Sequence, residues 1–129
     1  MALVEVRNLS FSYGNQKVLE DISFKLGAGE IFCLFGPNGC GKSTLLECVL
    51  GILKIPRGCV YLNGRDVRNL RPAETARHMS YVPQLHEKTF PYTVEEVVLM
   101  GRAAYTGMFS SPSEEDYAAV EETIRRVGI

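Results

Sequence analysis

The chain of 129 residues lacks the features that mark membrane-spanning and secreted proteins. No apolar run approaches the roughly 20 residues that a spanning helix needs. Residues 1–7 do not show a basic start followed by a long apolar stretch, so the sequence predicts no signal peptide. We therefore expect any association with a membrane to come through a partner protein.

Strong net charge and clustered metal ligands are also missing. The formal net charge is −1, which gives no broad attraction to nucleic acid or to acidic lipid. The four cysteines, at positions 33, 40, 48 and 59, have no C-x-x-C spacing, and only two histidines could join them as ligands. We interpret the cysteines as cytoplasmic thiols with structural or neutral roles.

Residues 36–44 form a glycine-rich phosphate loop of the pattern G-x-x-x-x-G-K-[ST]. Its glycines permit positive φ and let backbone N–H groups surround a phosphate chain. Lys42 would reach the β- and γ-phosphates, Ser43 would place a hydroxyl on Mg²⁺, and Thr44 would bind the α-phosphate side. An ordinary glycine turn is the alternative interpretation. The loop consists of Gly36, Pro37, Asn38, Gly39, Cys40, Gly41, Lys42, Ser43 and Thr44.

The flanking residues give this loop the strand-to-helix context that the pattern requires. Residues 31–35 form an apolar run bounded by polar and glycine residues, which predicts a buried parallel strand. Apolar residues recur at helical spacing after the loop, and Gly51 is placed to end that helix. The helix N-terminus adds unpaired N–H groups and the positive end of its dipole to the predicted site.

The remaining chain predicts short strands followed by helices. Residues 3–24 alternate as antiparallel strands around a turn at 14–15, and residues 59–67 read as a hairpin whose turn is Asn63-Gly64. A short strand is expected at 81–82. Capping boxes predict helices from Thr93 to about Met100 and from Ser113 to Gly128, the latter with Glu121–Arg125 and Glu122–Arg126 pairs. We interpret the arginines between 65 and 77 as a solvated face rather than a phosphate or nucleic-acid contact.

Taken together, these segments resemble the ATP-binding subunit of ABC transporters. The resemblance covers essentially the whole chain and rests on residues 26–30, 36–46 and 81–84; residues 92–102 resemble the branch that serves importers of metal chelates such as iron-siderophore, haem, cobalamin or molybdate. It implies an α/β fold of the P-loop NTPase class, with amino-terminal antiparallel strands and a partial parallel core sheet with helices.

The resemblance also assigns two residues outside the loop. Tyr13 falls where the family stacks an aromatic ring on adenine, an interaction that needs only the flat face of the base. Without the resemblance, Tyr13 would be interpreted as an aromatic residue on a strand face. Gln84 falls at the glutamine loop, which approaches Mg²⁺ and senses the membrane subunit. From the sequence alone, Gln84 is a polar loop residue.

The chain departs from the family pattern because several catalytic parts are absent. We find no signature loop, no apolar strand ending in Asp-Glu, and no switch histidine; neither His78 nor His86 matches that position. Residues 1–129 therefore resemble the amino-terminal part of one nucleotide-binding domain, in which Lys42 and Gln84 contribute to an incomplete catalytic set. The strand at 31–35 would lack a neighbour, so we expect the isolated chain to self-associate.

The expected function is ATP binding with Mg²⁺ and, in the complete protein, ATP hydrolysis that powers metal-chelate transport. The resemblance implies transmembrane permease subunits and a second ATP-binding subunit as partners, no nucleic acid, and a peripheral place on the inner face of the cell membrane. A nucleotide-binding fragment without turnover is the alternative. A phosphate-loop kinase would need a basic lid, whereas residues 113–129 are acidic with only Arg125 and Arg126.

Overall fold

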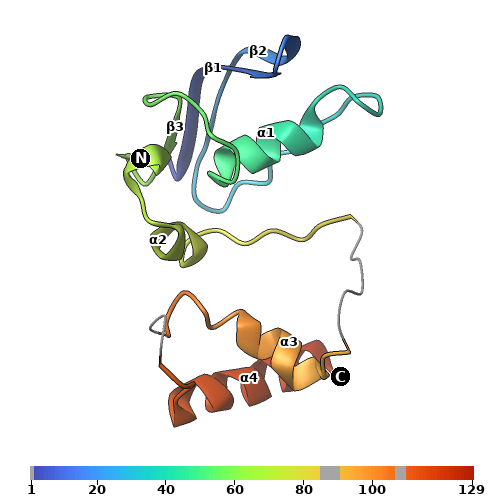
Figure 1. Ribbon diagram of the computed structural model, residues 1–129, viewed down its shortest axis with the longest axis vertical. Helices are drawn as coiled ribbons and strands as arrows, with labels where there is room; N and C mark the ends of the chain where they lie inside the picture. Colours follow the sequence, from blue (N-terminus) through green and yellow to red (C-terminus); the bar gives the residue numbers. More distant parts are fainter. Residues whose placement is uncertain (1, 85–90, 107–109) are drawn as a thin grey trace. The chain divides into compact units, whose positions relative to one another are not determined.

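A computed structural model describes residues 2–84, 91–106 and 110–129. The chain divides into two units, residues 1–71 and residues 72–129, and each unit is described by itself. The first unit holds a small sheet and one α-helix, and the second unit is helical (Figure 1). Within the described residues, no helix is long and apolar enough to cross a membrane.

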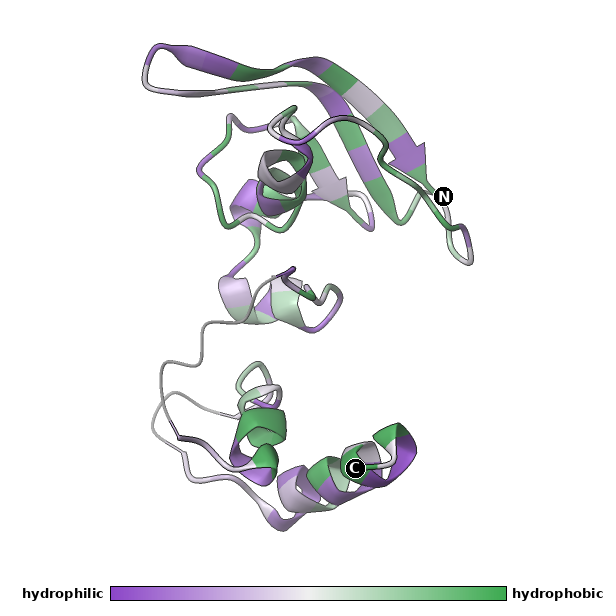
Figure 2. Cartoon of the chain, turned by 90° about the vertical axis from the view of Figure 1, so that its right-hand side faces the viewer, coloured by the Kyte–Doolittle hydropathy of each residue, from purple (hydrophilic) through white to green (hydrophobic). Residues whose placement is uncertain are grey.

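The first unit is built on a four-stranded antiparallel sheet. Strand β1 (Val4–Tyr13) pairs with β2 (Gln16–Leu26) on one side and with β3 (Val60–Leu62) on the other, and β3 pairs with β4 (Arg65–Asp66), which gives the order β2-β1-β3-β4. Hydrophobic and hydrophilic bands alternate along the long hairpin, as expected for a sheet with one covered face (Figure 2). The predicted amino-terminal strands are confirmed.

The second hairpin is confirmed together with its turn. Asn63 and Gly64 have φ values of 49° and 77°, so both central residues adopt the positive φ that a type I′ turn requires. The 3₁₀-helix η1 (Val67–Asn69) follows, and the side chain of Asp66 accepts a hydrogen bond from Arg68 N at its start. Asp66 also accepts from Gly58 N at 2.7 Å, which ties the two ends of this hairpin together.

The long hairpin is interrupted in its middle by two residues with positive φ, Asn8 (44°) and Asp21 (49°). The register shifts there, and side chains replace the missing ladder bonds: Asn8 Nδ2 donates to Asp21 Oδ1 at 2.7 Å. Asn8 N donates to Ser23 Oγ at 2.8 Å, and Asp21 N donates to Ser10 Oγ at 2.9 Å. Because Asn and Asp tolerate the left-handed region and offer short polar side chains, they suit this double irregularity.

Helix α1 (Lys42–Val49) covers the core of the first unit. Its buried residues Leu45 and Cys48 join the apolar face of the sheet, and burial raises the pKa of the Cys48 thiol to about 11. The helix ends as predicted, since Leu50 is its C-cap and Gly51 follows with φ 73°. The sheet residues buried in this core are Val4, Val6, Leu9, Leu19, Val60 and Leu62.

Two expected strands are not formed. Residues 31–35 are extended but belong to no strand, and Ile31 and Phe35 are 93% and 92% exposed, so the predicted buried parallel strand and the parallel part of the core sheet are absent from the described residues. A strand needs a neighbour for its backbone N–H and C=O groups, and the described chain supplies none here. For the same reason Tyr81 and Val82 form no strand, and Val82 is 89% exposed.

The second unit contains α2 (Pro72–Ala76), α3 (Val94–Met100) and α4 (Glu114–Val127). Both predicted capping boxes are confirmed, with Thr93 capping α3 and Ser113 capping α4. On the outer face of α4, Glu122 pairs with Arg126 at 2.8 Å as predicted, and it also pairs with Arg125.

An ion pair joins the ends of α3 and α4. Arg102 Nε donates to Asp116 Oδ1 at 2.7 Å, while Asp116 Oδ2 accepts from Ser113 N at 2.9 Å and from Ser113 Oγ at 2.8 Å. These bonds, first from the Ser113 backbone and then from Arg102 and the Ser113 hydroxyl, lower the pKa of Asp116 from 3.8 to about 2. The buried carboxylate of Asp116 thus completes the capping box of α4 and also binds Arg102, the residue that follows the C-cap of α3.

We predict that Asp116 makes the second unit sensitive to acid. Because its folded pKa lies below its ordinary value, its stabilisation is present above about pH 4 and is lost as the pH falls toward 2. Asp116→Asn should therefore be less stable than the wild type at neutral pH and should lose less stability on acidification. Helical circular dichroism during denaturant titrations across this range measures both effects.

Glu115→Gln is the matched control, since Glu115 is an exposed carboxylate in the same first turn of α4. It should keep the wild-type slope of stability against pH. An Asp116→Asn variant as acid-sensitive as the wild type would show that this carboxylate does not control the acid response.

Candidate nucleotide-binding site

The phosphate loop is held in shape by glycines and by a packed cysteine. Gly39 and Gly41 have φ values of 80° and 96°, so residues with a β-carbon would be strained at both positions. At Gly36 the constraint is space: an added Cβ would lie 2.6 Å from Cys40 Sγ. Cys40 N also donates to Pro37 O at 3.4 Å, so the loop folds back on its own first residues.

The ammonium group of Lys42 lies against the backbone of this loop. Lys42 Nζ donates to Gly36 O and to Pro37 O, each at 2.7 Å, and it lies 3.7 Å from Cys40 Sγ. The two carbonyl oxygens offer the partial negative charge that phosphate oxygens would offer more strongly. Lys42 can exchange these partners for a phosphate without moving far from the loop.

The start of α1 adds unpaired backbone donors to the loop. Its N-cap is Gly41, which provides no side-chain hydrogen bond, and the first turn contains no acidic residue. The N–H groups of this turn and the positive end of the helix dipole are therefore not neutralised by the helix itself. Ser43 is exposed in this first turn, and Thr44 beside it is half-buried. The arrangement suits an anion.

The end of the phosphate loop packs on the long hairpin that carries Tyr13. An added Cβ at Gly41 would lie 3.0 Å from Val18 Cγ1 and 3.1 Å from Leu19 Cδ2, so the end of the loop packs on β2. Leu19 pairs with Phe11 across the hairpin, and Phe11 and Tyr13 share one strand face, with ring centroids 5.0 Å apart in an edge-to-face contact. Tyr13 is 49% exposed, so its ring is accessible, and its role in stacking on a base stays a prediction.

The structure does not test the predicted approach of Gln84 to the loop. Gln84 is an exposed residue of the second unit, whereas the loop belongs to the first. His78 is likewise exposed in the second unit, and His86 lies outside the described residues. The magnesium role of Gln84 thus stays a prediction.

The side chains near the loop suit a magnesium ion that is bound mainly by the phosphates of a nucleotide and by water. No group of three or more His, Cys, Asp or Glu residues that could hold a metal ion occurs in the described ranges 2–84, 91–106 and 110–129. Mg²⁺ in phosphate sites keeps several water molecules and takes few protein ligands. The exposed Ser43 at the start of α1 fits such a minor role.

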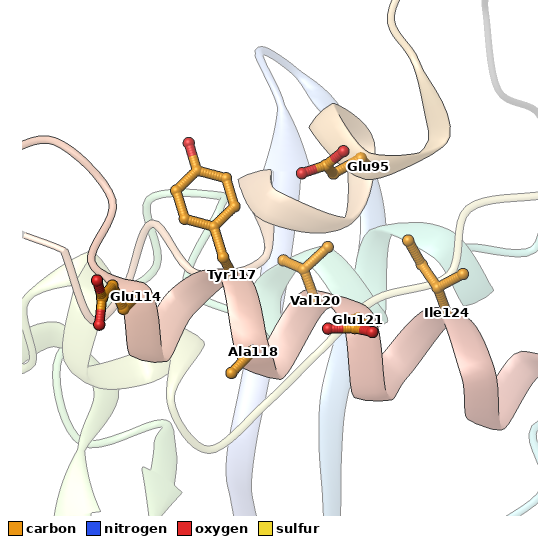
Figure 3. A pocket seen from close by; sticks show the side chains of 7 residues that line it. All are labelled: Glu95, Glu114, Tyr117, Ala118, Val120, Glu121 and Ile124. Atoms are coloured by element: carbon orange, nitrogen blue, oxygen red, sulfur yellow. The ribbon is translucent and has the colours of Figure 1, made fainter.

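The second unit carries a separate groove between α3 and α4. It has a volume of about 570 Å³, and its apolar side chains Tyr117, Val120 and Ile124 rise from α4 toward α3 (Figure 3). Carboxylates border it, with Glu95 on α3 and Glu121 on α4 among its lining residues. The sequence predicted the apolar face of α4, but not that α3 would leave part of it open.

Three contacts escaped the sequence interpretation. They are the packing of Cys40 on Gly36, the bonds from Lys42 to the loop carbonyls, and the Arg102–Asp116 pair. The first left no usable signal, because the loop glycines were expected to adopt positive φ and only the structure shows that Gly36 does not. The pairing of Arg102 with a residue 14 positions away left no such signal.

Comparison with protein families identifies the pattern as a known one. A family described as ABC transporter matches residues 19–129. An uncharacterized ABC transporter ATP-binding protein of Methanocaldococcus jannaschii is 41% identical over 127 residues, which cover 97% of this chain and 43% of that protein.

Relatives with named cargo show a similar match. The achromobactin transport ATP-binding protein CbrD of Dickeya dadantii is 34% identical over 99% of this chain and 48% of its own length. The hemin import ATP-binding protein HmuV of Bradyrhizobium diazoefficiens is 43% identical over 78% of this chain and 37% of its own length. The chain thus spans about half the length, or less, of these relatives.

The solved structure of an ATP binding subunit of an ABC transporter matches the fold. Its TM-score is 0.72 at 32% identity, and the match covers 95% of this chain and 49% of that one. The fold class expected from the sequence, that of the nucleotide-binding domains of ABC ATPases, is confirmed, and the missing parallel strand is a difference within it.

We predict that a methyl group at position 36 distorts the loop. In Gly36→Ala the new Cβ would lie 2.6 Å from Cys40 Sγ, so the cysteine side chain must move within the loop and nucleotide affinity should fall. Adding Cys40→Ala removes the sulfur and should restore most of the lost affinity. Isothermal titration of the wild type, both single variants and the double variant measures this coupling.

The double variant separates this clash from a general intolerance of alanine in the loop. If Gly36→Ala binds equally weakly with and without Cys40, then the sulfur is not the obstacle and the packing described above does not shape the site.

Proposed function

The chain belongs to the ABC transporter family, and from this premise we propose that it binds MgATP through residues 36–44 as part of the ATP-binding subunit of a metal-chelate importer. The observation that carries the proposal is the position of Lys42. Its ammonium group lies 2.7 Å from two loop carbonyls, beside a helix start with no acidic residue in its first turn. A phosphate chain is the ligand that satisfies these donors together.

Each part of the loop has a role in this proposal. Backbone N–H groups of the loop and of the first turn of α1 donate to phosphate oxygens, and Lys42 supplies the mobile positive charge. Ser43 offers its hydroxyl to the magnesium ion, whose chemistry is to neutralise charge that develops on the phosphates. Tyr13, on the hairpin that also packs against the end of the loop, offers an exposed ring for the base.

Hydrolysis is proposed for the complete protein rather than for this chain alone. Phosphoryl transfer to water needs a group that orients the water and charge stabilisation beyond the γ-phosphate. The residues around Lys42 form only the near side of such a site. We propose that a second ATP-binding subunit and the remaining half of the protein supply the far side. The alternative function is nucleotide binding without turnover.

The cargo class is proposed from two observations. Residues 92–102, which include α3, resemble the branch that serves metal-chelate importers, and two relatives are named for transport of achromobactin and import of hemin. Permease subunits would carry the cargo and hold this subunit on the inner face of the cell membrane. The groove between α3 and α4 offers an apolar floor with carboxylates around it, which suits a permease segment that has both apolar and basic residues.

We predict that the chain binds MgATP and that Lys42→Ala weakens binding at least about tenfold, because a charge-assisted contact to phosphate is lost. The experiment titrates ATP with and without magnesium and follows phosphate release in the same samples. Lys54→Ala is the control, since Lys54 is an exposed lysine outside the loop. It should bind as the wild type does.

The phosphate measurement distinguishes the two functions. Binding without phosphate release assigns the chain a nucleotide-holding role and leaves turnover to the complete protein. Phosphate release that Lys42→Ala abolishes would place a water-orienting group within these residues. Equal binding by the wild type and Lys42→Ala would overturn the proposed site.

A further inference from the structure

Phe11 connects Tyr13 to the part of the long hairpin on which the phosphate loop packs. Phe11 is half-buried on β1 and lies opposite Leu19 of β2, which is only 5% exposed. Opposed residues of an antiparallel pair share one face of the sheet. An added Cβ at Gly41 would lie 3.1 Å from Leu19 Cδ2, so the same leucine lies against the end of the loop. Phe11 is therefore held next to a buried residue on which the loop packs.

The backbone around Tyr13 does little to fix its ring. Tyr13 pairs with Gln16 as the last pair before the turn, whose first residue, Gly14, has a φ of 56°. Both Tyr13 and Gln16 are exposed, so burial does not restrict the ring to one rotamer. A side chain that is immobilised only when a ligand binds costs free energy at that step, whereas a ring that is already held in place does not.

A direct contact with Phe11 supplies this restraint. The two ring centroids lie 5.0 Å apart and the ring planes are inclined by 85°, which is a favourable edge-to-face arrangement. The register of the hairpin shifts between Phe11 and Ser12, so the ladder is irregular between the two ring-bearing residues. Irregularities of this kind increase the local twist of a strand and re-aim its side chains. The ring contact and the register shift together restrict the orientation of the Tyr13 ring.

We propose that Phe11 is a positioning residue for base stacking, because its ring holds the ring of Tyr13 in the orientation that the base of a nucleotide meets. This inference rests on the proposed function, since it needs Tyr13 to contact the base of bound MgATP. Phe11 acts through Tyr13 and makes no contact with the nucleotide of its own. Its loss should therefore weaken ligands that carry a base and should not affect ligands that consist of phosphates alone.

The first test compares MgATP with magnesium tripolyphosphate, which has the phosphates but no base, by isothermal titration of the chain. Phe11→Leu keeps an apolar side chain opposite Leu19 and removes the ring. Its affinity for MgATP should fall about two- to tenfold, the cost of immobilising one side chain on binding, and its affinity for magnesium tripolyphosphate should not change. Equal affinities of the wild type and Phe11→Leu for MgATP, or an equal loss for both ligands, would overturn the proposal.

Further variants separate the ring of Phe11 from general effects on the sheet. Phe11→Val, which has a high strand propensity, is a second variant without a ring and should behave as Phe11→Leu does, whereas Phe11→Tyr keeps a ring and should bind as the wild type does. Phe24→Leu is the matched control, since it removes another aromatic stack of the first unit, that of Phe24 on Phe32. It should keep the wild-type ratio of the two affinities. A ratio lowered equally by Phe24→Leu and Phe11→Leu would contradict a specific role of Phe11.

A double variant tests whether Phe11 acts through Tyr13. Tyr13→Ala should weaken binding of MgATP by itself, because the proposed stacking ring is lost. Adding Phe11→Leu to Tyr13→Ala should cause no further loss, since no ring is left to position. Losses that add in the double variant would show that Phe11 acts independently of Tyr13, and this result would overturn the proposal.

Lys42→Ala separates failure of this inference from failure of the proposed function. It should weaken binding of both ligands, because both carry phosphates. If it does so and Phe11→Leu leaves the affinity for MgATP unchanged, the phosphate site stands and the positioning role is wrong. If the wild-type chain binds neither ligand, the proposed function fails and this inference fails with it.

Discussion

The pairing of backbone N–H and C=O groups between strands is the constraint on which the first unit depends. β1 and β2 pair across a short turn, as do β3 and β4, and β3 returns to β1 to join the two hairpins into one sheet. Residues 31–35 are as apolar as these strands, yet they form no ladder within the described residues. Strand formation here follows the presence of a partner rather than the composition of the segment.

This constraint changes how the phosphate loop is held. A loop that follows a paired strand inherits its position from the sheet, but here the preceding segment is exposed. The loop is instead fixed from its other end, where Gly41 packs on Val18 and Leu19 and α1 buries Leu45. Its own contacts, from Lys42 to the carbonyls of Gly36 and Pro37, complete the shape. The site is therefore held by its own local contacts together with one contact to β2, which lies far from it in sequence.

The same distinction explains what the sequence could predict. Turns and caps are local: Asn63-Gly64 selected its turn, and Ser113 with Asp116 selected a helix start, because each depends on residues within four positions. The Arg102–Asp116 pair and the Asn8–Asp21 bond join residues far apart in sequence. The residue types at these positions do not predict which residues will pair. The prediction of a buried strand at 31–35 was wrong, because burial of this segment requires a neighbouring strand and the sequence pattern of the segment does not show whether one is present.

The proposed contacts to phosphate and to the base come from different segments of the chain, and this bears on how the site would select among nucleotides. Every contact proposed for phosphate comes from residues 36–44, whereas the contact proposed for the base comes from Tyr13 on the long hairpin. Phosphate contacts do not distinguish one nucleoside triphosphate from another, and a ring face stacks on any base. The proposed contacts would thus recognise the triphosphate and not the identity of the base. Discrimination between bases would have to come from groups that hydrogen-bond to the base edge, and neither the loop nor the ring of Tyr13 provides them.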